Sequence, residues 1–265
     1  MPDPSHIKGV LFDLDGVLYV GPQVIEGARE AIDALRGAGY RCRFVTNTST
    51  MSMASLRKKL AALGFDVPAH ELISAPQATI LYLRGLDKPR CRLLLADDVK
   101  QDFAEFVSDD SHPDVVIVGD IGQTWSYALL DSVFNNLLQG ARLIAVPKNR
   151  FWQIEHGLKL DIGGFIAALE YASGVETMII GKPSLDFFNV ALADMQLEPA
   201  EVLMVGDDID SDVGGAQQAG IRAALVRTGK YRAAYYEASA IKPDLILDSV
   251  ADLPVALQRE RAINT

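Results

Sequence analysis

The chain has 265 residues, of which 49% are hydrophobic, and this length and composition suit one or two globular domains. Its formal net charge of −10 disfavours nucleic acid as a partner, because the chain as a whole repels phosphate backbones. No apolar run approaches the roughly 18 residues that a membrane helix needs, and the first residues lack a signal-peptide pattern, so we expect a cytoplasmic protein without a membrane partner.

Short apolar runs alternate with longer helical patterns along the chain. In chain order, the sequence predicts strands at residues 10–12, 42–45, 93–95, 115–118, 143–146, 178–180, 202–205, 223–226 and 245–247. Helices are predicted between them, most clearly at 25–38, 52–63 and 125–138, after 164, from 185 and at the C-terminal end. This alternation is typical of an α/β protein with a doubly wound parallel-sheet (Rossmann-like) core. The number of strands exceeds that of one small open sheet, which indicates two α/β units.

The two cysteines, Cys42 and Cys91, lack the spacing of a metal site. We expect both to be reduced thiols packed on strands.

The strongest chemical signal is the segment Phe12–Leu18, which directly follows the first predicted strand. Alternation along the chain places Asp13 and Asp15 on the same side of the backbone, and Gly16 permits a tight turn close to a ligand. Two neighbouring carboxylates suit a division of labour in which one is ionised and one can carry a proton. A solvated acidic turn at a strand end is the alternative.

Carboxylates also crowd the end of the strand at 202–205. Two like charges ~4 Å apart repel by about 1 kcal/mol in water and by several times more near a protein, so a cation is needed to compensate this cluster. Several hard oxygen ligands favour Mg²⁺ over Zn²⁺. We assign the metal site to Asp207 and Asp212, whereas Asp208 or Asp210 could serve as a helix cap.

Two further strands end in residues that suit a phosphate group. Thr46 and Asn47 follow the strand at 42–45, where a hydroxyl and turn amides could cradle phosphate, although Ser and Thr are also common helix caps. Lys182 follows the strand at 178–180. A nucleotide-binding P-loop would require glycine where Glu176 stands, so we interpret Lys182 as a local positive charge, with a surface lysine as the alternative.

These four signals, each after a predicted strand and in this order, resemble the haloacid dehalogenase-like hydrolase superfamily over essentially the whole chain. The similarity is strongest to the branch of NagD-type nucleotide phosphatases, phospholysine phosphohistidine inorganic pyrophosphate phosphatase and its "domain-containing 2" relatives. It extends to residues 164–172, 206–217 and 228–232. The resemblance implies a Mg²⁺-dependent phosphatase that hydrolyses phosphomonoesters of small metabolites through an aspartyl-phosphate intermediate.

The resemblance also implies a role for each motif residue. Asp13 would attack phosphorus, and Asp15 would protonate the leaving oxygen and later take a proton from water. Thr46 and the Asn47 amide would hold the phosphoryl oxygens, and Lys182 would neutralise charge. The magnesium ligands implied in this way are Asp13, the backbone carbonyl of Asp15, and Asp207, with Asp212 close by.

Thr46 and Lys182 must meet at one phosphate although they are far apart in sequence, so the intervening α/β pattern is interpreted as an inserted cap domain. We predict a discontinuous core of residues 1–78 and 177–265 and a cap of residues 79–176, which in the family is a large α/β domain.

Substrate choice would reside in the cap. Lys148 and Arg150, beside Phe151 and Trp152, suit an anionic or ring-bearing substrate. The two aromatic residues could equally belong to the core or to a subunit interface, and a homodimer through the cap is common among the relatives.

Several alternatives stay open. The same aspartyl-phosphate could serve cleavage of pyrophosphate or of P–N bonds, or phosphoryl transfer to an acceptor other than water. A regulatory protein that binds phosphate without turnover is the alternative outside the enzymes, and the cap together with the full motif set disfavours it.

Overall fold

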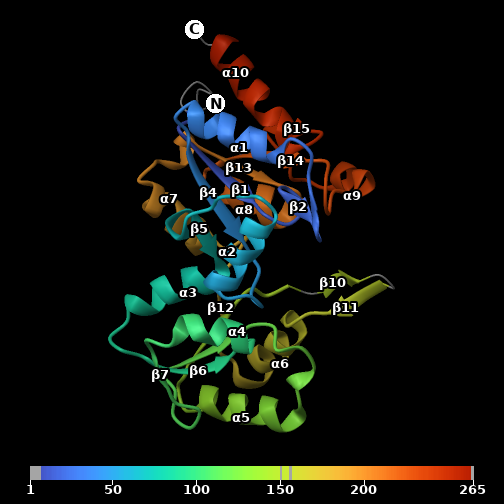
Figure 1. Ribbon diagram of the computed structural model, residues 1–265. Coiled ribbons are helices and arrows are strands. Elements are labelled where there is room, and N and C mark those ends of the chain that lie inside the picture. The colour runs from blue at the N-terminus through green and yellow to red at the C-terminus, as the bar shows by residue number, and fades with distance from the viewer. Residues whose placement is uncertain (1–6, 150, 155–156, 264–265) are drawn as a thin grey trace. The chain divides into compact units, whose positions relative to one another are not determined.

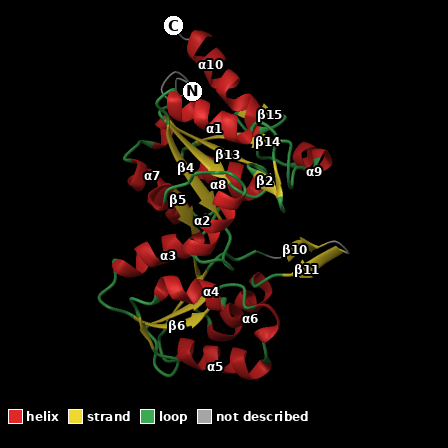
Figure 2. Cartoon of the chain, in the orientation of Figure 1, coloured by secondary structure: helices red, strands yellow, loops and turns green. Residues whose placement is uncertain are grey.

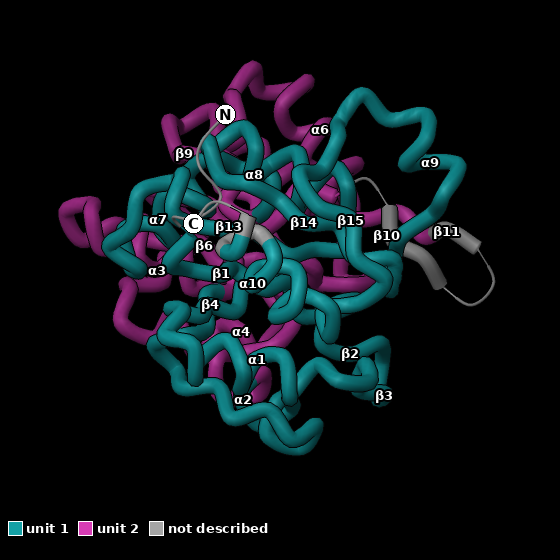
Figure 3. The backbone as a smooth tube through the Cα atoms, turned by 90° about the horizontal axis from the view of Figure 1, so that it is seen from above, with its two compact units in different colours: residues 1–46, 57–73, 182–265 teal, residues 47–56, 74–181 magenta. Residues whose placement is uncertain are grey.

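The computed structural model describes residues 7–149, 151–154 and 157–263. The chain forms two compact units, which are coloured separately in Figure 3. The first unit comprises residues 1–46, 57–73 and 182–265, and the second comprises residues 47–56 and 74–181. The predicted cap, residues 79–176, begins and ends a few residues inside the second unit and leaves out 47–56.

A six-stranded sheet with the order β15-β14-β13-β1-β4-β5 forms the centre of the first unit (Figure 1). β1 pairs in parallel with β4 and β13, and β14 pairs in parallel with β13 and β15. The strands are β1 (Gly9–Asp13), β4 (Arg41–Thr46), β5 (Leu72–Ser74), β13 (Val202–Gly206), β14 (Arg222–Val226) and β15 (Leu245–Leu247). The carboxyl ends of β1, β4 and β13 therefore lie at the same edge of the sheet.

The central position of β1 follows from its sequence. All five of its residues are buried, as expected for a continuous apolar run in a parallel sheet that is covered on both faces. Phe12 of β1 stacks on Phe44 of β4, with ring centroids 5.6 Å apart. This packing fixes the two strands beside each other just before their functional ends.

Helices lie on both faces of this sheet (Figure 2). On α1, the buried residues Ala28, Ala31, Ile32 and Leu35 form one face of the helix, and this spacing explains why the segment folds as an amphipathic helix. The chain's helices are α1 (Ala28–Gly37), α2 (Met53–Ala62), α3 (Ala75–Arg84), α4 (Asp97–Lys100), α5 (Tyr127–Leu138), α6 (Gly163–Ser173), α7 (Leu185–Met195), α8 (Gly215–Gln218), α9 (Ala233–Ala238) and α10 (Leu253–Ile263). Short 3₁₀ turns occur at η2 (Ala69–Glu71), η3 (Gln101–Phe103), η4 (Gly122–Thr124), η5 (Pro199–Glu201) and η7 (Val250–Asp252).

The second unit has its own five-stranded sheet, with the order β12-β9-β8-β6-β7 and parallel pairing. α5 and α6 pack on this sheet around a buried cluster that includes Val116, Leu143 and Ile166. The strands are β6 (Arg90–Leu94), β7 (Val107–Ser108), β8 (Val115–Val118), β9 (Arg142–Ala145) and β12 (Met178–Ile179). Two antiparallel hairpins complete the chain: β2 (Tyr19–Val20) with β3 (Gln23–Val24), and β10 (Phe151–Ile154) with β11 (Gly157–Leu160).

The predicted fold class, an α/β protein with a doubly wound parallel-sheet core, is confirmed. Cys42 and Cys91 are both free and buried, as predicted. None of the helices in the described part of the chain is long and apolar enough to cross a membrane.

Candidate active site

Asp13 is the last residue of β1, and its side chain is buried. Two residues further on, Asp15 is exposed and forms a bridge with Tyr19, while the amide of Gly16 donates to the Tyr19 carbonyl at 2.7 Å. The chain thus turns back directly after the strand. The turn places one carboxylate inside the site and one at its solvent-facing side.

Lys182 joins two of the predicted aspartates. Its ammonium contacts Asp13 Oδ1 and lies 2.6 Å from Asp212 Oδ1, and its side chain is only 3% exposed. Burial would lower the pKa of Lys182, but the carboxylates of Asp13 and Asp212 outweigh this and raise the pKa above its ordinary value. Lys182 is therefore a fixed positive charge in the site.

A π-helical turn, η6 (Ile209–Gly214), positions Asp212. The amides of Asp212 and Val213 both donate to the Asp208 carbonyl, at 3.0 and 3.3 Å. The Asp208 side chain caps this turn by accepting from the amides of Asp210 and Ser211, as the sequence suggested for that residue. Asp210 is exposed and accepts a hydrogen bond from Tyr235 instead.

Glycines allow the loops after β1 and β13 to approach each other. Gly16 has a φ of +93°, and a Cβ there would lie 1.9 Å from Asp207 Oδ2. At the end of β13, a Cβ on Gly206 would lie 2.2 Å from the Cβ of Asp212. Since any larger residue would displace one of these carboxylates, both glycines are required by the geometry of the site.

Asp13, Asp207 and Asp212 form a buried cluster in which one oxygen from each lies within 4.8 Å of the others. Burial, then the charges of Asp13 and Asp212, raises the pKa of Asp207. Burial likewise raises the pKa of Asp212, although Lys182 opposes the shift. One ammonium does not balance three carboxylates, so the site favours a further cation.

The donor set fits a magnesium ion. Asp207 is 2% exposed, and its Oδ1 has no hydrogen-bond partner within the described residues. A buried carboxylate oxygen without a partner is costly unless it binds a cation, and a cluster of carboxylate oxygens suits Mg²⁺. Asp13, Asp207 and Asp212 are the residues that would hold or border the ion.

The other predicted phosphate ligands are Thr46 and Asn47. Thr46 ends β4 and is buried, one residue beyond Val45, which is the register partner of Asp13. Asn47 belongs to the second unit, where its side-chain oxygen lies beside Gly181. The assignment of these two residues to phosphate stays a prediction.

Lys148 does not have a free ammonium group. It forms an ion pair with Glu170, at 2.8 Å from Oε1 and 2.6 Å from Oε2, and both side chains are half-buried. Arg150 lies outside the described residues. For Phe151 and Trp152 the structure describes the backbone as part of β10. A substrate role for Lys148 or Arg150 therefore stays a prediction.

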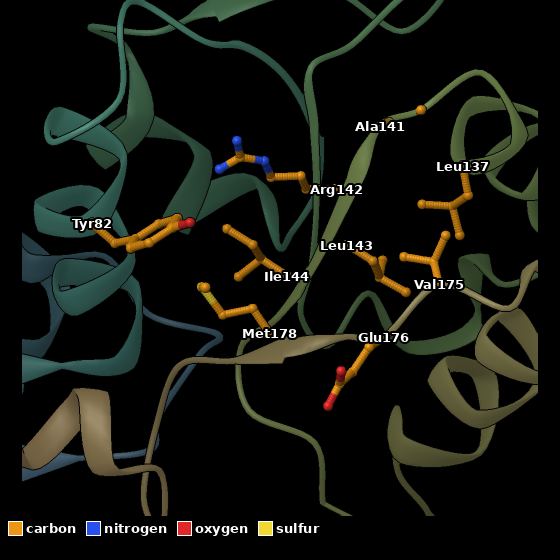
Figure 4. Close-up of a pocket in the computed structure, with 10 residues that line it drawn as sticks. Tyr82, Leu137, Ala141, Arg142, Leu143, Ile144, Val175, Glu176 and Met178 are labelled. Atoms are coloured by element: carbon orange, nitrogen blue, oxygen red, sulfur yellow. The ribbon is translucent and has the colours of Figure 1, made fainter.

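One cavity of the second unit is separate from all of these residues (Figure 4). It has a volume of about 310 Å³ and is lined mainly by apolar side chains, with Tyr82, Ile144 and Met178 facing its interior. Since none of the predicted site residues line it, it is not a candidate active site.

The loop after β14 contacts both strand ends that carry the aspartates, although no role was predicted for it. The amide of Lys230 donates to Asp207 Oδ2 at 2.6 Å, and the Thr228 hydroxyl donates to the Gly16 carbonyl. The signal available in the sequence was the pair Thr228-Gly229, which follows an apolar strand after one intervening residue. Residues 228–230 were otherwise part of a segment, 228–232, that resembles the family.

Comparisons with known proteins agree with this arrangement. A family model described as "Haloacid dehalogenase-like hydrolase" matches residues 10–106, and one described as "HAD-hydrolase-like" matches residues 179–253. The two matches together span the strand ends that carry Asp13, Lys182 and Asp207.

Relatives cover nearly the whole chain. Phospholysine phosphohistidine inorganic pyrophosphate phosphatase of Bos taurus is 40% identical over 256 residues, which is 94% of this chain and 93% of the relative. Haloacid dehalogenase-like hydrolase domain-containing protein 2 of Homo sapiens is 39% identical over 92% of this chain and 93% of its own length.

Solved structures share the fold. 4-Nitrophenylphosphatase from Thermotoga maritima superposes with a TM-score of 0.89 at 27% identity, covering 96% of this chain and 99% of the other. NagD from E. coli K-12 superposes with a TM-score of 0.83 at 27% identity, covering 93% and 98%. The chain therefore belongs to the haloacid dehalogenase-like hydrolases, in their NagD-type branch, and is a phosphatase.

Proposed function

We propose that this phosphatase is magnesium-dependent, that Asp13 is its nucleophile, and that it hydrolyses phosphomonoesters of small metabolites. The observation that carries the proposal is the ion pair of buried Lys182 with Asp13 and Asp212, beside an Asp207 oxygen that has no hydrogen-bond partner in the described part of the chain. This arrangement concentrates negative oxygens around one ammonium. It suits the capture of a phosphoryl group together with a divalent cation.

The proposed chemistry has two steps. An oxygen of Asp13 forms a bond to phosphorus while the bond from phosphorus to the leaving oxygen breaks, and Asp15 donates a proton to that oxygen. Water then attacks phosphorus, Asp15 takes up its proton, and the bond to Asp13 breaks to release phosphate. The exposed position of Asp15 allows its proton to exchange with solvent.

Lys182 would offset the charge that gathers on the phosphoryl oxygens during both steps. Magnesium, when bound, would supply further charge neutralisation and help to orient the phosphoryl group. Thr46, buried at the end of β4, would donate its hydroxyl to a phosphoryl oxygen.

A second substrate class is favoured by one observation. The 40% identical relative from Bos taurus is named for phospholysine, phosphohistidine and pyrophosphate. Cleavage of P–N bonds or of pyrophosphate can pass through the same aspartyl-phosphate, so it is the alternative for this chain. A cytoplasmic location and a homodimer stay predictions.

A substrate panel separates the two classes. Purified full-length protein would be assayed for phosphate release from 4-nitrophenyl phosphate, phosphorylated sugars and nucleotides, pyrophosphate, phospholysine and phosphohistidine, each with magnesium and with a chelator. We expect magnesium-dependent release with highest kcat/KM on a small phosphomonoester. Preference for pyrophosphate or a P–N substrate would support the alternative, and no release from any compound would contradict both.

Replacing Asp13 tests the nucleophile. We expect Asp13→Asn to lower kcat by at least about a thousand-fold, because the neutral amide cannot form the acyl phosphate. Asp97→Asn is the matched control, since the Asp97 side chain is 96% exposed in the second unit, and it should keep full activity. Wild-type activity in Asp13→Asn would refute the assignment.

A further inference from the structure

The loop Thr228–Lys230 connects an exposed part of the first unit to its buried carboxylates. Gly229 and Lys230 are exposed, yet the Lys230 amide reaches Asp207, which is 2% exposed. On the other side, the Thr228 hydroxyl donates to the carbonyl of Gly16, in the turn that carries Asp15. One short loop thus contacts both strand ends that supply carboxylates to the site.

The two oxygens of Asp207 have different surroundings. Oδ2 accepts the Lys230 amide at 2.6 Å, whereas Oδ1 is buried and has no partner among the described residues. A carboxylate with one oxygen anchored cannot easily rotate about its last side-chain bond. The anchored oxygen therefore fixes the position of the other oxygen, in a carboxylate that belongs to the cluster with Asp13 and Asp212.

Gly229 makes this contact possible. Its φ is +56°, and a Cβ there would lie 2.1 Å from Asp207 Oδ2 and 2.4 Å from the Cα of Gly16. Real Cβ atoms do not approach so closely, so any side chain at this position would push Asp207 or the turn at Gly16 out of place. The backbone of Gly229 is therefore in close contact with Asp207 and Gly16, with no space for a side chain between them.

We propose that the loop Thr228–Lys230 is a positioning element of the metal site: it holds Asp207 through the Lys230 amide and the Gly16 turn through the Thr228 hydroxyl. The inference rests on the proposed function in taking the ion to be Mg²⁺. Residues that orient a metal ligand change metal affinity by about 10–100-fold when they are altered. A loop that only connects two secondary-structure elements would not change the affinity for the ion.

The test is magnesium binding measured by titration calorimetry on the full chain after the ion has been removed. We expect Gly229→Ala to weaken magnesium binding at least about tenfold. Gly21→Ala is the matched control, because Gly21 has nearly the same φ, +57°, and a Cβ there meets no atom within 4 Å. It carries the same conformational cost without the contact, so its magnesium affinity should equal that of the wild type.

Two more variants locate the effect. Thr228→Val keeps the shape but removes the hydroxyl, and it should weaken magnesium binding even if Gly229→Ala fails to fold. Lys230→Ala keeps the amide and removes the ammonium, so it should bind magnesium nearly as well as the wild type, whereas Lys230→Pro, which lacks the amide, should not.

The outcomes separate this inference from the proposed function. Wild-type magnesium affinity in both Gly229→Ala and Thr228→Val, or equal weakening in Gly21→Ala, would overturn the role of the loop and leave the phosphatase proposal standing. A wild-type protein that binds no magnesium would instead contradict the metal dependence itself.

Discussion

Lys182 is a cation buried between two carboxylates, an arrangement that is stable only while both kinds of charge are present. Removing one partner of a buried ion pair leaves an uncompensated charge, which typically costs about 3–5 kcal/mol. Here the imbalance exists even with Lys182 in place, because Asp13, Asp207 and Asp212 share its single charge. We therefore expect stability to depend on whether a further cation occupies the proposed metal site.

The first prediction concerns pH and the metal-free protein. The pKa values of Asp207 and Asp212 are raised in the folded state, so the stability linked to these groups is present below the ordinary carboxyl pKa and is lost as pH rises through the raised values. The raised pKa of Lys182 does not oppose this, because its contribution is lost only above the ordinary lysine value of about 10.4. We expect the thermal midpoint of metal-free protein to fall between about pH 5 and about pH 8.

At the higher pH, magnesium should raise the thermal midpoint most of the way back, because the ion compensates the charge of the ionised carboxylates. Asp207→Asn is the comparison, and its melting temperature should depend less on pH over the same interval. Equal pH dependence in the wild type and in Asp207→Asn would contradict the raised pKa of Asp207.

Most of the residues that lie together in the candidate site could be predicted from the sequence. Asp13, Asp207 and Asp212 lie at or beyond the ends of β1 and β13, and strands in one parallel sheet end at one edge, so their meeting could be anticipated. Lys182 follows β12, which belongs to the sheet of the second unit, so this rule alone does not place it beside them. The ion-pair partner of Lys148 could not be predicted. Glu170 lies on a helix 22 positions away, and no local sequence pattern links the two residues. The hydrogen bond from the Lys230 backbone amide to Asp207 could not be predicted either, because every residue except proline has such an amide.

At the scale of elements, apolar runs located the long strands well. The predicted strand at 115–118 coincides with β8 (Val115–Val118), and the one at 245–247 coincides with β15 (Leu245–Leu247). The two-residue strands β2, β3 and β7 were not predicted, because two residues carry no periodic signal. The hairpin β10–β11 was not predicted either. Its first residues, Phe151 and Trp152, were interpreted as part of a substrate-binding segment.

α6 contains a fully buried residue and a nearly fully exposed one, so substitutions at the two positions should differ in their effect on stability. Ile166 is 0% exposed in the cluster with Val116 and Leu143, whereas Tyr171 is 95% exposed. We expect Ile166→Ala to lower the free energy of unfolding by about 2–5 kcal/mol, through lost burial and the cavity left behind. Tyr171→Ala should change it by no more than about 0.5 kcal/mol.

Denaturant unfolding followed by circular dichroism measures both variants. A loss of stability in Tyr171→Ala as large as that in Ile166→Ala would show that α6 does not pack as described.

For the whole molecule, the discontinuous first unit explains why the residues of the candidate active site are so widely spaced in sequence. Its first segment supplies β1 and β4 and its last segment supplies β13 to one sheet, while a second sheet is built from residues between these segments. An insertion was predicted because the family resemblance assigns Thr46 and Lys182 to one phosphate. The chain passes between the two units after residues 46, 56, 73 and 181, and one of these passages, after Thr46, lies at a strand end.

The predicted magnesium ligands Asp13, Asp207 and Asp212 all belong to the first unit. Magnesium binding should therefore stabilise the first unit. We expect magnesium to slow amide hydrogen exchange in residues 13–16, 206–214 and 228–230, because the ion stabilises the loops that hold its ligands. Strands β6, β8 and β9 of the second unit should exchange at unchanged rates. Protection confined to the second unit would contradict the assigned site, and Asp207→Asn should remove the effect altogether.

The central claim is that Asp13 carries the phosphoryl group during turnover. The most direct measurement is an acid quench within the first turnover, followed by borohydride reduction and peptide mass spectrometry. Borohydride converts an aspartyl-phosphate to homoserine, so the account predicts homoserine at position 13 and nowhere else. Reduction at another carboxylate, or an unmodified Asp13 throughout a complete first turnover, would contradict it.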